Sequence, residues 1–299
     1  GYYQNFSDAH NLMSYRHTRA HNSLLVNGIG QPYSTEGYGS VMRAMGGQHI
    51  SYCLGDASHA YRGISNDPMW VGYFKQAGIE QTPENGFGAT PLTKYRRHVL
   101  MLHPHTVIVY DELEASEAVR WEWLLHSPTE FKMDITKKTL STNNKTKGWV
   151  AVTQLFGGHV FTLSQTDRFV VPPAITGAEY PNQWHLTARV DGCSATRFLA
   201  IIQVGDEAVP IINRDGDTFN VGDWTIKAVL DASKAPELAV SHRTEQAVFS
   251  YGTDNPALNG NFYSRQYTGS SLLYDEIDGA YQVVEMTDRS PISTRVVNQ

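Results

Sequence analysis

The sequence predicts an all-β fold, built as one large antiparallel β-sandwich of the supersandwich-like type. From Ser23 onward, short runs of β-branched and aromatic residues are bounded by Gly, Pro, Asn and Asp. No segment carries a long apolar pattern with the helical period, and we find no internal repeat. At 299 residues the chain is long enough for a single large sandwich, since all-β folds often exceed about 200 residues as one domain.

The first predicted strands are bounded by recognisable turns. SLLVNGIGQP, residues 23–32, is typical of a strand that enters an Asn-Gly turn. HVLMLHPHTVIVYDEL, residues 98–113, predicts two strands, Val99–Leu102 and Thr106–Tyr110, around a tight His-Pro-His connection. This pattern indicates antiparallel pairing of neighbouring strands.

The next segment, AVRWEWLLHS at residues 118–127, alternates in a way that predicts a half-buried strand. One face carries Val119, Trp121, Trp123 and Leu125, and the other carries Arg120, Glu122, Leu124 and His126. Six later runs have the same character and predict further strands: WVAVTQLF, HVFTLSQ, WHLTARV, RFLAIIQV, WTIKAVLD and AVFSYG.

Two segments depart from this pattern. Residues 1–16 are interpreted as a lead-in, and residues 17–299 as the sandwich domain. Residues 61–95 are rich in Gly, Pro and aromatic residues, and we expect a long loop there, of the kind that is usually functional or disordered. Its aromatic residues either stack on sugar rings or anchor the loop to the sandwich, and we favour anchoring. They are Trp70, Tyr73, Phe74 and Phe87.

The charges are distributed unevenly along the chain. The formal net charge is −6, yet residues 1–110 carry eight Lys and Arg against six Asp and Glu, whereas the remainder carries sixteen against twenty-four. Eight of the twelve histidines also lie in residues 1–110. A locally basic, His-rich region suits an anionic ligand. Nucleic acid is an improbable partner without basic runs or a binding motif, and no apolar run is long enough for a membrane span.

Two groups of residues could carry chemistry. His21, Asp56 and His126 lie at the edges of predicted strands, and two imidazoles with a carboxylate are a common set of ligands for Zn²⁺. The alternative is that they are three unrelated polar residues at strand ends. A second group supplies the Tyr, His and Arg that proton abstraction beside a carboxylate requires. It comprises Tyr15, His17, Arg19, Tyr61, Arg62 and Arg96.

Other chemistries find no support in the sequence. There is no G-x-S-x-G elbow and no phosphate-binding loop. Carboxylates are abundant, but nothing opposes two of them as glycoside hydrolysis requires. Cys53 and Cys193 have neither metal-ligand nor disulfide-framework spacing, and we expect buried thiols.

Four blocks in order resemble the β-sandwich domain of the heparinase II/III-like family of polysaccharide lyases. They are TRAHNSLLVNGIGQ, GDASHAY, RRHVLMLHPHTVIVYDEL and WEWLLHSP, which span residues 18–128. The resemblance implies an enzyme that joins a helical toroid to a large antiparallel sandwich and cleaves uronic-acid polysaccharides by β-elimination. Because no amphipathic helical array precedes residue 17, the toroid is absent from this chain, which looks like the C-terminal half of such a lyase.

The resemblance also implies functional residues. Several family members hold zinc through a His, an Asp and a second His, which by motif position are His21, Asp56 and His126. Family members also place a catalytic histidine two residues before the zinc histidine, where this sequence has Arg19. Three alternatives stay open: His17 takes over that role, Arg19 binds the substrate carboxylate, or the chemistry rests on the absent toroid. Tyr61 is the sandwich tyrosine expected to transfer a proton.

The functional prediction is therefore the sandwich half of a zinc-containing lyase that acts on an acidic glycan such as a glycosaminoglycan or alginate. The alternative is a non-catalytic carbohydrate-binding or scaffolding module. Under either hypothesis we expect the isolated chain to be inactive, because most substrate-binding residues of the family come from the toroid. A periplasmic or secreted location follows from the resemblance alone.

Overall fold

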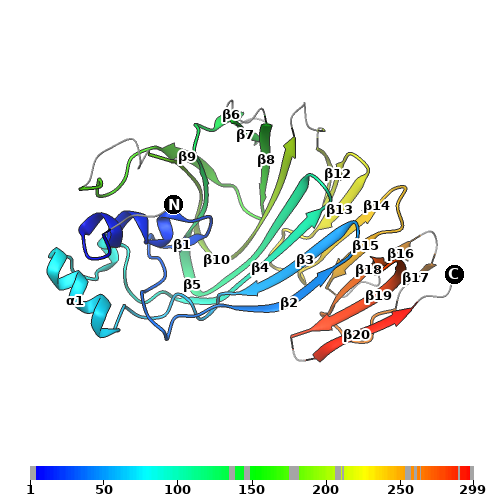
Figure 1. Cartoon of the computed structure of the whole chain (residues 1–299), viewed down its shortest axis with the longest axis horizontal. Coiled ribbons are helices and arrows are strands. Elements are labelled where there is room, and N and C mark those ends of the chain that lie inside the picture. Colours follow the sequence, from blue (N-terminus) through cyan, green and yellow to red (C-terminus); the bar gives the residue numbers. More distant parts are fainter. Residues whose placement is uncertain are drawn as a thin grey trace.

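The computed structural model contains two large antiparallel sheets, which confirms the predicted all-β sandwich (Figure 1). The structure describes residues 5–134, 139–144, 149–174, 182–205, 210, 212–252, 257–258, 261–262, 264–288 and 290–296.

The larger sheet contains the strands predicted within the four sequence blocks at residues 18–128. Its order is β2 (Ser40–Gly46), β3 (Ile50–Asp56), β4 (Leu92–Leu102), β5 (Thr106–Ser127), β10 (Trp184–Gly205), β8 (Trp149–Gly157), β7 (Thr139–Asn144) and β6 (Lys132–Asp134), with β1 (Leu24–Val26) paired to β5 and β9 (Thr162–Thr166) paired to β10. The turn between β1 and the bridge at Ile29 has positive φ at Asn27 and Gly28, as the Asn-Gly prediction requires.

The smaller sheet comes from the C-terminal part of the chain. Its order is β11 (Asn213–Asp215), β12 (Thr218–Val221), β13 (Trp224–Ala228), β14 (Leu238–His242), β15 (Val248–Tyr251), β18 (Ser271–Ile277), β19 (Ala280–Thr287) and β20 (Ser290–Val296). A separate two-stranded pair joins β16 (Ala257–Leu258) to β17 (Asn261–Phe262).

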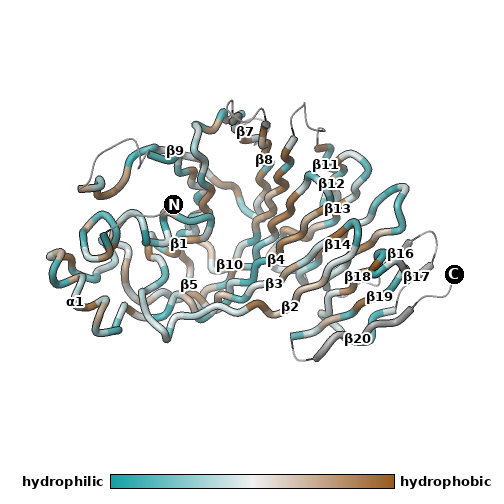
Figure 2. The backbone as a smooth tube through the Cα atoms, viewed as in Figure 1, coloured by the Kyte–Doolittle hydropathy of each residue, from teal (hydrophilic) through white to brown (hydrophobic). Residues whose placement is uncertain are grey.

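The long strands β5 and β10 serve two hydrophobic cores. Near one end they carry Ile108 and Leu199, which belong to the core packed between the two sheets. Toward the other end they carry Trp121, Trp123 and Val190, which form a second core against β1. Hydrophobic residues gather along the facing strands, whereas many turns are hydrophilic (Figure 2). One sheet therefore supports both the sandwich and the N-terminal region beside β1.

The prediction of a long loop over residues 61–95 is wrong for part of that segment, because helix α1 (Pro68–Ala77) lies within it. Asp67 is its N-cap and accepts a hydrogen bond from the Met69 N–H at 2.9 Å, with proline at the first helical position. Gly78 ends the helix in the left-handed conformation, with φ of 67°. The Asp-Pro and Gly signals were present, but ten residues are too few for a clear helical period.

The lead-in segment is part of the folded structure. It forms a π-helix, η1 (Asn11–Tyr15), followed by the 3-10 helix η2 (Thr18–Ala20). Leu12 and Met13 pack in a small core with Phe74 of α1 and with Phe87, which follows the 3-10 helix η3 (Pro83–Asn85). Phe74 and Phe87 thus anchor this segment to the lead-in rather than to the sandwich.

Candidate functional site

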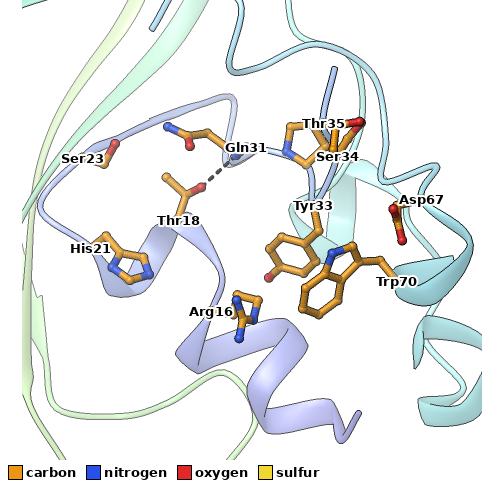
Figure 3. Close-up of a pocket in the computed structure, with 11 residues that line it drawn as sticks. Arg16, Thr18, His21, Ser23, Gln31, Tyr33, Ser34, Thr35, Asp67 and Trp70 are labelled. Carbon is orange, nitrogen blue, oxygen red and sulfur yellow. Dashed lines mark hydrogen bonds between the residues drawn. The ribbon is translucent and has the colours of Figure 1, made fainter. Parts of the chain in front are cut away.

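A cavity of about 440 Å³ lies where the N-terminal segment meets α1. We call it the arginine pocket, and it is shown in Figure 3. Its walls combine a cationic side chain, an aromatic platform and several hydroxyl and amide groups, all from residues 16–35 and the start of α1. They are Arg16, Thr18, His21, Ser23, Gln31, Pro32, Tyr33, Ser34, Thr35, Asp67 and Trp70.

Arg16 is the cationic group of this pocket. It is the C-cap residue of η1, and its guanidinium carbon lies 4.8 Å from the ring centroid of Trp70 and 5.2 Å from that of Phe6. The Nε atom is buried and makes no hydrogen bond within the described part of the chain. Contacts with aromatic faces hold the guanidinium in place, and its terminal N–H groups have no hydrogen-bond partner among the described residues.

Tyr33 packs against the Trp70 ring, and its hydroxyl group is not free to act as an acid. Its ring lies 5.1 Å from the Trp70 centroid, and its hydroxyl donates to the Leu12 carbonyl oxygen at 2.6 Å. Burial raises the pKa of Tyr33 well above its usual range, so the phenol stays protonated. Thr18 fixes another wall, because its Oγ1 accepts a hydrogen bond from the Gln31 N–H at 2.8 Å.

His21 is the exposed imidazole of the pocket. It follows η2 directly, as the C-cap residue, and its backbone N–H donates to the Thr18 carbonyl oxygen. Figure 3 shows its ring at the η2 end of the wall, with Arg16, Tyr33 and Trp70 on the other side. His21 is the predicted site residue that lines this pocket.

His17 is the N-cap residue of η2 and is fully buried. Its Nε2 donates to the Gly86 carbonyl oxygen at 3.0 Å, and its Nδ1 accepts from both Arg19 N and Arg19 Nε. Burial, with the nearby charge of Arg19, lowers the pKa of His17 to about 3. Both ring nitrogens are thus occupied, so this geometry does not support His17 as a base and instead gives it the task of orienting Arg19.

Arg19 and Tyr61 also lie outside the arginine pocket. Arg19 donates to the Asn85 carbonyl oxygen and lines a different cavity of about 510 Å³, together with Arg120 and Glu122. Tyr61 is fully buried in the second core and donates to the Leu24 carbonyl oxygen, and burial raises its pKa. This geometry does not support proton transfer by Tyr61.

The predicted zinc ligands are not arranged to bind a metal ion. Asp56 accepts from the Ser58 N–H and lies 3.5 Å from Arg96 Nε. Both ring nitrogens of His126 have protein partners, since Nε2 lies 2.8 Å from the Arg19 carbonyl oxygen and Nδ1 lies 3.0 Å from Asn22 Oδ1. Among the described residues, no three His, Cys, Asp or Glu side chains form a group that could hold a metal. His21, Asp56 and His126 therefore do not fit zinc as a set.

This arrangement predicts that the zinc content of the purified chain does not depend on Asp56. The Asp56→Ala variant should show the same zinc-to-protein ratio as the wild type by elemental mass spectrometry, because Asp56 belongs to no group of metal-ligating side chains among the described residues. Asp215→Ala, at an exposed position, is the matched control. Stoichiometric zinc that disappears in Asp56→Ala alone would contradict the assignment.

Arg16 was not among the candidate residues predicted from the sequence. Arg16 lies in the segment interpreted as a lead-in, and its partner Trp70 lies in the segment interpreted as a loop. The basic character of residues 1–110 was the available signal, but it carries no spatial information. Trp70 was one of four aromatic residues for which anchoring was the favoured interpretation, and it packs against the small core of Leu12, Met13, Phe74 and Phe87.

Comparisons with known proteins give a family match and structures of similar fold. A family profile described as "Heparinase II/III-like, C-terminal" matches residues 1–189. The fold is similar to a heparinase III crystal structure with a TM-score of 0.51, at 14% identity, over 89% of this chain and 32% of that one. No curated protein matches the sequence.

Two further structures show the same likeness of fold. A heparinase III with methylated lysines gives a TM-score of 0.51 at 13% identity, over 77% of this chain and 29% of that one. A mutant of the heparan sulfate lyase HepC from Pedobacter heparinus gives 0.50 at 13% identity, over 79% and 31%. The chain thus spans less than a third of the length of these structures. None of the helices in the described segments is long and apolar enough to cross a bilayer.

Proposed function

The chain belongs to the heparinase II/III-like family through its C-terminal domain, and from this premise we propose that it is the β-sandwich half of a polysaccharide lyase that cleaves uronic-acid glycans by β-elimination. The observation that carries this proposal is the guanidinium of Arg16, which is held against Trp70 in an open polar cavity. An arginine beside an aromatic platform suits a sugar ring that bears a carboxylate.

In β-elimination a base removes the C5 proton next to the carboxylate, the C4–C5 double bond forms, and the C4–O bond breaks with protonation of the leaving oxygen. Removal of that proton places negative charge on the carboxyl group. A fixed guanidinium stabilises this developing charge more strongly than it stabilises the ground state, which lowers the barrier. We assign this role to Arg16, with Trp70 positioning the ring.

His21 is the imidazole that lines the arginine pocket. It is exposed and belongs to the same cavity as Arg16. We therefore propose that His21 faces the substrate, whereas His17 and Tyr61 maintain the local structure. No step is routed through zinc, because His21, Asp56 and His126 do not fit it as a set.

The Arg16→Ala variant is expected to bind a uronic-acid oligosaccharide about 10- to 100-fold more weakly than the wild type. Loss of a charge-assisted hydrogen bond costs roughly 1.5–3 kcal/mol, which corresponds to this range. Isothermal titration calorimetry with heparan sulfate oligosaccharides measures it. Arg62→Ala removes an exposed arginine as a matched control and should bind normally. Equal loss in both variants would indicate non-specific electrostatics and would contradict the proposal.

A non-catalytic carbohydrate-binding module is the second candidate, and the buried positions of His17 and Tyr61 favour it. The two hypotheses differ in the activity of the chain joined to a helical toroid. We expect unsaturated product, detected by ultraviolet absorbance, from the joined protein and none from the chain alone. Product from neither would favour the binding module.

The same proposal assigns the partners and the location. The substrate is an acidic polysaccharide, and the partner domain is a helical toroid of the same protein. An enzyme that degrades external glycans acts in the periplasm or outside the cell, and we propose that setting for this protein.

A further inference from the structure

A second cavity of about 370 Å³ lies at the opposite end of β5 from the arginine pocket, where turns of the two sheets meet. We call it the turn pocket. The large sheet contributes the His103–Thr106 turn between β4 and β5 and the end of β10, and the small sheet contributes the β12–β13 turn and His242. Its volume falls in the range of small-molecule sites, about 300–1,000 Å³.

Two hydrogen-bond donors line this pocket. His242 Nδ1 accepts from the Glu245 N–H at 2.9 Å, so the proton of the neutral ring lies on Nε2. Trp224 packs edge-to-face on His242, with centroids 4.5 Å apart. Among the described residues, neither the Trp224 indole N–H nor the His242 Nε2–H has a hydrogen-bond partner, and neither nitrogen is fully buried. Both donors are available to a ligand.

Residues with oxygen acceptors also line the pocket, among them Thr106, Asp223 and Gln203. Gln203 is only 3% exposed, and its Nε2 donates to the Pro210 carbonyl oxygen at 3.0 Å. Its Oε1 is buried and accepts no hydrogen bond from the described part of the chain. Because this oxygen has almost no accessible surface, a ligand in the pocket does not reach it. Leu102, Val204 and Val221 add apolar surface.

The charges around the pocket argue against an anionic ligand. Asp223 lines it, and the nearby Arg243 guanidinium is committed to that carboxylate. Three histidines line the pocket, His103, His105 and His242, and neither Lys nor Arg is among its lining residues in the described chain. A carboxylate disfavours an anion, and hydrogen-bonding groups beside apolar walls suit a sugar ring whose hydroxyl and carbonyl groups carry no charge.

We propose that the turn pocket binds a neutral pyranose residue of the glycan, as a peripheral subsite separate from the arginine pocket. The inference rests on the proposed function for the identity of the ligand as a glycan, but the selectivity for a neutral ring comes from the turn pocket itself. Two sites on one chain raise the apparent affinity for a polymer that reaches both.

The experiment uses the indole N–H resonances of the ¹⁵N-labelled chain, which contains six tryptophans. The Trp224→Phe and Trp70→Phe variants each remove one resonance and thereby assign it. The chain is then titrated separately with N-acetylglucosamine, as the neutral probe, and with glucuronate, as the anionic probe. We expect N-acetylglucosamine to shift the Trp224 resonance saturably and glucuronate to leave it in place.

Two variants connect the shift to the pocket. His242→Ala should weaken the N-acetylglucosamine response about 3- to 10-fold, in line with one lost neutral hydrogen bond, whereas Arg16→Ala should leave it unchanged. Absence of a saturable Trp224 shift, or an equal response to glucuronate, would overturn the inference. The Trp70 resonance reports the arginine pocket in the same titration, so failure of the proposed function appears there independently.

Discussion

Asp275→Ala is expected to lower the free energy of unfolding by roughly 3–5 kcal/mol, the cost of breaking a buried charged network. Asp275 lies on β18 and is fully buried. Its carboxylate accepts hydrogen bonds from the backbone N–H groups of His49, Ile50 and Glu276, and His49 Nδ1 donates to it at 2.7 Å. The substitution would leave these donors unpaired at the junction of the two sheets.

Urea denaturation measures this loss, since the midpoint falls in proportion to the free energy. Asp215→Ala removes a carboxylate from an exposed position and should change stability by no more than about 0.5 kcal/mol. Gly47→Ala tests the same junction from the other side, because a Cβ atom there would overlap the Asp275 side chain. Such extrapolations are precise to roughly 1 kcal/mol. If the free energy of unfolding of Asp275→Ala lay within about that margin of the wild-type value, this junction would be dispensable.

Stability is expected to fall when the pH drops from 7.5 to 5, through histidines that the fold buries in the neutral form. Burial lowers the pKa of His17 from 6.5 to about 3, and burial also lowers the pKa of His98. Unfolded histidine therefore binds a proton below pH 6.5 that the folded residue does not bind. At pH 5 the His17 contribution alone is about 2 kcal/mol, and His98 adds a loss of the same sign.

Urea denaturation at several pH values tests this dependence. The His17→Gln variant should lose about 2 kcal/mol less than the wild type over this pH interval, whatever its stability at neutral pH. His105→Gln removes an exposed histidine and should keep the wild-type slope. An unchanged slope in His17→Gln would refute the assignment.

Burial alone would raise the pKa of Glu112, but His98 and Lys94 lower it to about 2. Glu112 therefore stays ionised between pH 7.5 and 5 and does not contribute to the pH dependence in this window.

The fold was predictable because strand signals are local. The alternation of Val119, Trp121 and Trp123 and the Asn27-Gly28 turn each appear where the sequence placed them. The merging of two predicted strands into the 22-residue β5 was not predictable, because the connecting residues around Glu117 look like a turn when read alone. Pairing with β10 along its whole length, with register shifts near Cys193, keeps this segment extended.

The site was less predictable because its residues are brought together by tertiary structure. Arg16 and Trp70 meet only when α1 packs on the N-terminal segment, and no local spacing encodes that contact. His17 looked reactive in the sequence, but the Arg19 and Gly86 contacts that occupy both nitrogens belong to the folded chain. Both free thiols, Cys53 and Cys193, are half-buried, which departs from the expected full burial.

The most direct test of the proposed function compares a uronic-acid oligosaccharide with the same oligosaccharide after reduction of its carboxyl groups to alcohols. Calorimetric titration of the chain should give an affinity at least about 10-fold higher for the native oligosaccharide, because Arg16 pairs with the carboxylate. The Arg16→Ala variant should bind both forms equally. Equal affinity of the wild-type chain for both forms would contradict the assignment of the arginine pocket to the uronate and, with it, the proposed role in β-elimination.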